Sequence, residues 1–285
     1  MKLGYNTNGF AHHRLNDAIR ILGDLGYQSV AITLDFNSLH PFTADPFPYL
    51  DEVRELLESY QMSCVIETGA RYLLDRYRKH QPTLLDPDSS ARSKRVGMLL
   101  RAIEYAHHLN ANAVSFWSGT YSISEPADMT WQRLIDSCRW LSDHAARKDV
   151  RLAFEPEPGM LVATMDDFAR LHGNVNHPHF GLTLDLGHLH CLGEGPIPAI
   201  IKRWSRALWN VHLEDMRQGV HDHLMFGEGE MEFTSIAAAL HEVGYEGGVH
   251  VELSRHSYDA VNVAGAAYRF LVEHGFNTRE EAALV

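Results

Sequence analysis

The sequence predicts a single (β/α)₈ barrel, and two observations support this fold class. Eight short apolar runs recur along the 285 residues, with stretches of helical periodicity between them. No low-complexity linker divides the chain, so one eightfold α/β unit is favoured over two doubly wound domains. The runs expected to form strands are residues 3–5, 29–33, 63–66, 113–116, 151–154, 181–184, 208–211 and 248–251.

Each run is too short for a helix and too apolar to alternate, which is typical of a strand buried on both faces of a parallel sheet. Helices are expected between the runs, because apolar residues recur every three or four positions over residues 15–25 and 96–109. Residues 68–93 exceed a minimal βα loop and mix charges, aromatic rings and prolines, so we expect a lid or substrate loop there. We expect one domain over residues 1–285, ending in a tail from about 276 to 285.

Composition limits the partners of the chain. Its 25 Lys and Arg residues against 37 Asp and Glu residues give a net charge of −12, which opposes binding to nucleic acid or an anionic membrane. The longest apolar stretches fall far short of the roughly 20 residues that span a bilayer. With no signal-peptide pattern at the N-terminus, a cytoplasmic protein is expected. Cys64, Cys138 and Cys191 lack CxxC spacing, so neither a disulfide framework nor a thiolate zinc site is expected.

Four polar residues stand at the ends of consecutive predicted strands. Glu155, Asp185, His212 and Glu252 directly follow the last four apolar runs. The carboxyl ends of the strands meet at one end of a parallel barrel, so we expect these side chains to converge. Three carboxylates and one imidazole suit a hard or borderline divalent cation such as Mn²⁺, Mg²⁺, Co²⁺ or Zn²⁺.

Each of these residues also has a structural interpretation. Glu155 could be a solvated loop residue, Asp185 could cap the helix that follows it, and His212 could be a satisfied structural histidine. Glu252 is costly at the end of a buried strand unless a cation or a polar partner compensates. A shared site is favoured because all four residues occur at the same position of consecutive strands.

The order Glu, Asp-x-x-His, His and Glu at the ends of strands five to eight resembles the xylose isomerase-like TIM barrel superfamily, and the resemblance covers nearly the whole chain. That superfamily contains sugar phosphate isomerases and epimerases, including ketose 3-epimerases, hydroxypyruvate isomerase and inosose dehydratase. The resemblance implies one divalent metal ion bound by Glu155, Asp185, His212 and Glu252. Residues 221–229 also resemble the loop after strand seven of the family, so His223 and His188 would line the site.

The resemblance also implies a mechanism and a small-molecule substrate, a sugar or polyol. The metal would polarise a substrate carbonyl, and Glu155 and Glu252 would act as base and acid on the neighbouring carbon. Return of the proton can give an epimer or an aldose–ketose isomer, and loss of a β-hydroxyl makes the enzyme a dehydratase. Residues at the metal cannot separate these outcomes. Family members are often dimers or tetramers, so a homo-oligomer is implied. The sequence itself shows no recognisable subunit interface.

Further candidates for substrate binding lie mainly after the other strands, where the pattern is less specific. Trp117 could stack on a sugar or simply cover the barrel mouth, and Arg71 could bind a phosphate or carboxylate or be a solvated surface group. The sequence around Glu67 and Arg71 departs from simple ketose epimerases, which leaves the sugar open. The full set of substrate-binding candidates is His188, His223, Glu157, Trp117, Glu67, His40 and Arg71.

Two rival functions remain open. Endonuclease IV, a relative in the same superfamily, uses three zinc ions, and His221, Asp222 and His223 could be read as part of such a site. The net charge of −12 opposes this reading, because phosphate contacts dominate DNA affinity. The second rival is a non-catalytic barrel that keeps a metal for stability. Metal count tests the first rival, and hydrogen exchange into sugars tests the second.

Overall fold

The structure is a computed structural model that describes residues 1–69, 71–120 and 125–276. Its eight barrel strands are β1 (Lys2–Asn6), β2 (Ser29–Thr33), β3 (Ser63–Glu67), β4 (Val114–Phe116), β5 (Leu152–Phe154), β6 (Phe180–Asp185), β7 (Leu208–Leu213) and β10 (Gly248–Val251). They pair in parallel in the order β1, β10, β7, β6, β5, β4, β3, β2, and the barrel is closed. The predicted fold class is therefore confirmed. Of the predicted tail, residues 277–285 lie outside the described part of the chain.

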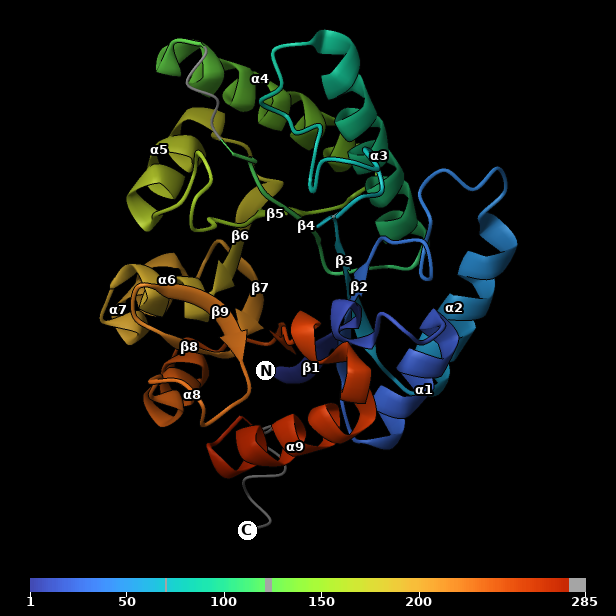
Figure 1. The fold of residues 1–285 in the computed structure, drawn as a ribbon, viewed down its shortest axis with the longest axis vertical. Coiled ribbons are helices and arrows are strands. Elements are labelled where there is room, and N and C mark those ends of the chain that lie inside the picture. The colour runs from blue at the N-terminus through green and yellow to red at the C-terminus, as the bar shows by residue number, and fades with distance from the viewer. Residues whose placement is uncertain (70, 121–124, 277–285) are drawn as a thin grey trace.

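Helices surround the strands, as Figure 1 shows. The α-helices are α1 (Leu15–Asp24), α2 (Phe47–Ser59), α3 (Ser89–His108), α4 (Ala127–Ala146), α5 (Met165–Val175), α6 (Leu186–Leu192), α7 (Ile197–Trp204), α8 (Phe233–Glu242) and α9 (Ala260–Glu273). Two 3-10 helices, η1 (Thr7–Phe10) and η2 (Ser254–Asp259), follow β1 and β10. No helix in the described part of the chain combines the length and the apolar content needed to cross a membrane.

The burial of the strand residues explains why the apolar runs of the sequence form the strands. All residues of β2, β6 and β10 are buried, because barrel strands face packed side chains inside and helices outside. The helices bury one stripe each; α1, for example, buries Leu15, Ala18, Ile19 and Leu22, at the spacing of one helical face. The strands therefore form a rigid cylinder, and the loops at its carboxyl end are free to carry polar residues.

Two local elements differ from the sequence predictions. Residues 89–93, expected within the lid or substrate loop, form the first turns of α3, whose start is capped by Asp88 accepting a hydrogen bond from the backbone of Ser90 at 3.0 Å. The segment after β7 also contains an antiparallel hairpin, β8 (Asp215–Arg217) and β9 (Val220–Leu224). This hairpin packs against α6 (Figure 1). Its residues His221 and His223 line the cavity described below.

Candidate metal centre

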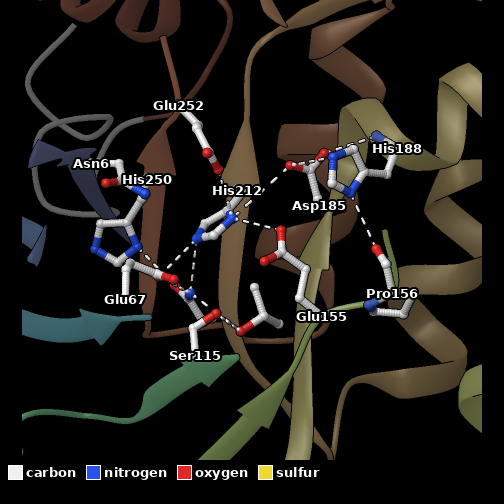
Figure 2. Close-up of polar contacts among 12 residues, drawn as sticks. Asn6, Glu67, Ser115, Glu155, Pro156, Asp185, His188, His212, His250 and Glu252 are labelled. Atoms are coloured by element: carbon white, nitrogen blue, oxygen red, sulfur yellow. Dashed lines mark hydrogen bonds and ion pairs between the residues drawn. The ribbon is translucent and has the colours of Figure 1, made fainter. Parts of the chain in front are cut away.

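Four strands deliver one cluster of potential metal ligands. Glu155 follows β5, Asp185 ends β6, His212 lies near the end of β7 and Glu252 follows β10. One ligand atom from each residue lies within 4.8 Å of the others. The spatial convergence expected from the sequence is thus present. Figure 2 shows the imidazole of His212 at the centre of the group.

His212 makes close contacts with carboxylates on both sides of its ring. Its Nδ1 lies 3.0 Å from Oε1 of Glu155 and 3.0 Å from Oε2 of Glu252, and 4.0 Å from Oδ2 of Asp185. Its Nε2 lies 2.9 Å from Oε1 of Glu67. Three carboxylates around one ring nitrogen require a positive charge at that point, which a proton or a divalent cation can supply.

Asp185 has two roles that the sequence presented as alternatives. Its Oδ1 accepts a hydrogen bond from the backbone N–H of His188 at 2.8 Å and so caps α6. Its Oδ2 is buried and makes no hydrogen bond in the described structure. A buried carboxylate oxygen without a donor is costly, and a cation at the cluster would satisfy it. The oxygen-rich donor set with one imidazole therefore fits a divalent metal ion.

The two glutamates differ in their electrostatic surroundings. Burial raises the pKa of Glu155 to about 8, against the opposing charge of His212. Burial also acts to raise the pKa of Glu252, but the charge and hydrogen bond of His212, with His223 and His188, outweigh it and lower that pKa below its usual range. Without an ion, the two carboxyl groups therefore favour different protonation states. A bound cation would favour the ionised form of both.

A cavity of about 440 Å³ opens beside the cluster, within the range of small-molecule sites. Asp185 lies behind the wall of this cavity, with 2% of its surface exposed. His40 is not brought to the cavity, because its ring packs between Phe36 and Phe42 in the segment between β2 and α2. The cavity is lined by these residues among those expected in the site: Glu155, His212, Glu252, His188, His223, Glu157, Trp117, Glu67 and Arg71.

One wall of the cavity comes from the segment between β3 and α3, which is anchored by the buried Arg95. The guanidinium donates to the backbone carbonyls of Pro82 at 2.9 Å, His80 at 2.7 Å and Thr68 at 3.2 Å. It also lies 4.8 Å from the ring centroid of Trp117, which is 8% exposed. Trp117 therefore presents only a small edge to the cavity. A role of the segment as a lid or substrate loop stays a prediction.

Three histidines form another polar wall. Nε2 of His221 lies 3.0 Å from Nε2 of His188 and 3.4 Å from Nε2 of His223. The other ring nitrogens of His188 and His223 contact the backbone carbonyls of Pro156 at 3.2 Å and Glu252 at 3.1 Å. Since a carbonyl only accepts, Nδ1 of both rings carries a proton, and the Nε2 atom of each ring lies next to Nε2 of His221.

Sequence reasoning missed several residues of the site. Asn8 in η1 donates from Nδ2 to Oε1 of Glu252 at 2.8 Å, and His221 was considered only for a nuclease. Glu214 is fully buried next to the cluster, and burial, followed by the charge of Asp185, raises its pKa well above the usual range. The alternation of His221 and His223 was a usable signal, since residues two apart share one face of a strand.

The fold and the centre together define a class of protein: a closed (β/α)₈ barrel with three carboxylates and a histidine at the carboxyl ends of its strands. The model of the xylose isomerase-like TIM barrel family matches residues 19–274. The chain therefore belongs to this family, as the resemblance in its sequence indicated.

Individual relatives are more distant. The chain is 25% identical over 240 residues to L-ribulose-5-phosphate 3-epimerase UlaE of Salmonella paratyphi C (strain RKS4594), across 83% of this chain and 81% of that protein. It is 29% identical over 142 residues to the inosose dehydratase of Lacticaseibacillus casei, across 44% of this chain and 47% of that protein. The solved structure of the IolI protein with a bound zinc atom shares the fold, with a TM-score of 0.75 at 19% identity and coverage of 96% and 98%.

Proposed function

We propose that the chain is an epimerase or isomerase of a sugar, a sugar phosphate or a polyol-like hydroxy-carbonyl compound, and that it depends on one divalent metal ion. The observation that carries the proposal is the placement of Glu155 and Glu252, which line the cavity and approach Nδ1 of His212 at 3.0 Å each. The relative that aligns over most of the chain is named as a sugar-phosphate epimerase, which supports this substrate class.

The metal ion, Mn²⁺, Mg²⁺, Co²⁺ or Zn²⁺, would be held by Glu155, Asp185, His212 and Glu252 and would supply a Lewis acid that polarises a substrate carbonyl. Glu155 and Glu252 remove and return the proton of the neighbouring carbon, one as base and the other as acid. Asn8 holds Oε1 of Glu252, which leaves Oε2 directed at the cluster. Return of the proton to the opposite face gives an epimer, and transfer to the adjacent carbon gives an aldose–ketose isomer.

The substrate hydroxyl groups need donors and acceptors on the cavity walls. His188, His223, Glu157, Arg71 and Trp117 all line the cavity. We assign these residues to substrate binding. Their mixture of imidazole, carboxylate and guanidinium groups suits a polyhydroxylated molecule better than an apolar one.

Hydrogen exchange tests the proposal directly. Candidate sugars are incubated in D₂O with metal-loaded protein, and deuterium incorporation at the carbon next to the carbonyl is followed by NMR. Glu155→Gln and Glu252→Gln should slow exchange by a factor of about 100 or more, because general acid–base groups contribute at least that much. Glu58→Gln, at an exposed position of α2, is the matched control and should exchange like the wild type. Full exchange in either active-site variant would refute the acid–base assignment.

The same experiment separates the alternative functions. A dehydratase, the activity named for one relative, would release water and give a dehydrated product rather than an epimer. A non-catalytic barrel would show no exchange with any sugar. The three histidines of the polar wall are the reason to test for a nuclease. His188, His221 and His223 form a second group of side chains that could hold a metal ion. A metal count near three per chain, rather than one, would favour that reading.

A further inference from the structure

Glu67 reaches across the barrel to the histidine of the candidate metal centre. It ends β3, and β3 and β7 are diametrically opposite, since four steps separate them in either direction around the eight-stranded barrel. Its Oε1 lies 2.9 Å from Nε2 of His212, on the other side of the imidazole from the three carboxylates of the cluster (Figure 2). Glu67 is 5% exposed, so water competes little for this contact.

A chain of buried polar groups fixes the position of Glu67. Nδ2 of Asn210 donates to Oε1 of Glu67 at 3.0 Å, and Oδ1 of Asn210 accepts from Nδ1 of His250 at 2.8 Å. The remaining nitrogen of His250 accepts from the hydroxyl of Ser29 at 2.9 Å. Asn210, His250 and Ser29 have no exposed surface. The reverse orientation of the Asn210 amide would place its oxygen against the Glu67 carboxylate, which is unfavourable.

The protonation of His212 follows from this arrangement. Nε2 of His212 could accept a hydrogen bond from Nδ2 of Asn210, 3.1 Å away, but its lone pair would then face the Glu67 carboxylate at 2.9 Å. With the proton on Nε2, the carboxylate accepts it in a charge-assisted hydrogen bond. With a cation at the cluster, the neutral ring would direct its Nδ1 lone pair to that cation, on the side of Glu155, Asp185 and Glu252. A ligating histidine whose other nitrogen donates to a carboxylate is a recurrent arrangement of metal sites.

We propose that Glu67 is a positioning residue for the metal centre: it accepts the Nε2 proton of His212 and so orients Nδ1 toward the ion. This inference rests on the proposed metal dependence and gives Glu67 a role through His212 in place of substrate contact. A direct ligand role is excluded by the geometry, because the two nitrogens of an imidazole point away from each other and Glu67 lies at the nitrogen that faces away from the cluster.

Two conservative variants of Glu67 distinguish the contribution of its contact with His212 from the contribution of its charge. Glu67→Gln keeps the length of the side chain and an acceptor oxygen but loses the charge, whereas Glu67→Asp keeps the charge and shortens the reach by one methylene. Mn²⁺ affinity is measured by calorimetry on ion-free protein of each. The proposal expects Glu67→Asp to bind about 10-fold or more weakly, the usual cost of losing a partner of a metal ligand, and Glu67→Gln to stay within about threefold of the wild type. The opposite ranking, or equal affinity in all three proteins, would overturn it.

A second readout does not depend on metal uptake. In protein labelled with ¹⁵N-histidine and free of added ions, the His212 Nε2–H signal should be present in the wild type and in Glu67→Gln, and weakened by solvent exchange in Glu67→Asp. An unprotonated Nε2 in the wild type, or a signal indifferent to both substitutions, would overturn the positioning role. If the wild type takes up none of Mn²⁺, Mg²⁺, Co²⁺ and Zn²⁺ yet shows this pattern, the proposed metal dependence fails while the orientation of His212 by Glu67 stands.

Discussion

Replacement of Asp215 by alanine should strongly destabilise the fold, although this residue is not part of the candidate metal centre. Asp215 begins β8 and is 1% exposed. Its Oδ1 accepts hydrogen bonds from the backbone N–H groups of Met216 at 2.9 Å and Met231 at 3.1 Å, and its Oδ2 accepts from those of Gly227 and Gly229, both at 2.9 Å. One carboxylate therefore ties both ends of the segment that carries the β8–β9 hairpin.

The size of the stability loss depends on which of the four N–H groups can be hydrated once the carboxylate is removed. Gly227 is exposed and Gly229 is half-buried, so their N–H groups can be hydrated when the carboxylate is removed. Met216 and Met231 are buried, and each would lose a hydrogen bond to a charged group, at a cost of about 2 kcal/mol per bond. We therefore expect Asp215→Ala to lower the free energy of unfolding by about 4 kcal/mol. Asp215→Asn can keep Oδ1 as the acceptor for both buried N–H groups, although without the charge, and should therefore lose less than Asp215→Ala.

Urea unfolding, followed by circular dichroism, measures these differences. Asp222→Ala is the matched control on the same hairpin, because it removes an exposed aspartate whose ion pair with Arg255 should contribute less than about 1 kcal/mol. A loss below about 1 kcal/mol in Asp215→Ala would refute the reasoning, since the four hydrogen bonds would then be replaced without cost.

Two further predictions concern titratable groups, of which His172 is half-buried and the two cysteines are buried. Burial among Phe168, Phe180 and Trp204 lowers the pKa of His172, so its neutral form stabilises the fold above pH 6.5, the unfolded value, and this contribution is lost as the pH falls. The wild type should thus lose more stability between pH 7 and pH 5 than His172→Gln, measured by urea unfolding; equal losses would contradict this. Burial raises the pKa of Cys64 to about 12 and that of Cys138 further, so both thiols should react with a disulfide reagent only after denaturation, and rapid reaction of the native protein would contradict it.

The sequence predicted the barrel because of how such strands are buried. Both faces of a barrel strand meet apolar side chains, so each strand leaves a continuous apolar run that can be found without an alignment. The predicted ends of the strands were less accurate than their positions. Glu67 and Asp185 belong to β3 and β6, but because they are polar the predicted apolar runs stopped before them. The β8–β9 hairpin left no apolar run, since β9 is only half-buried and alternates histidine with other residues.

The candidate site was predictable where position alone decides. The carboxyl ends of the strands meet at one end of a barrel. Glu155, Asp185 and His212 could therefore be grouped because each stands at the end of a predicted strand. Contacts across the barrel have no such signal. The hydrogen bond from His212 to Glu67 joins residues 145 positions apart, and no periodicity in the sequence relates them. His40 is the opposite case, in which a position after a strand did not lead to the site. It lies in the long segment between β2 and α2, where its ring packs against Phe42 and does not line the cavity.

The most direct test of the account is the metal content of the protein. Elemental analysis is made on protein purified without a metal-affinity tag, in parallel on the wild type and on Asp185→Ala. The account predicts about one Mn, Mg, Co or Zn per chain in the wild type and its loss in the variant, because Oδ2 of Asp185 is a buried ligand atom that accepts no hydrogen bond in the described structure. No metal in the wild type, and none taken up on addition, would contradict the account and make the four strand-end residues structural.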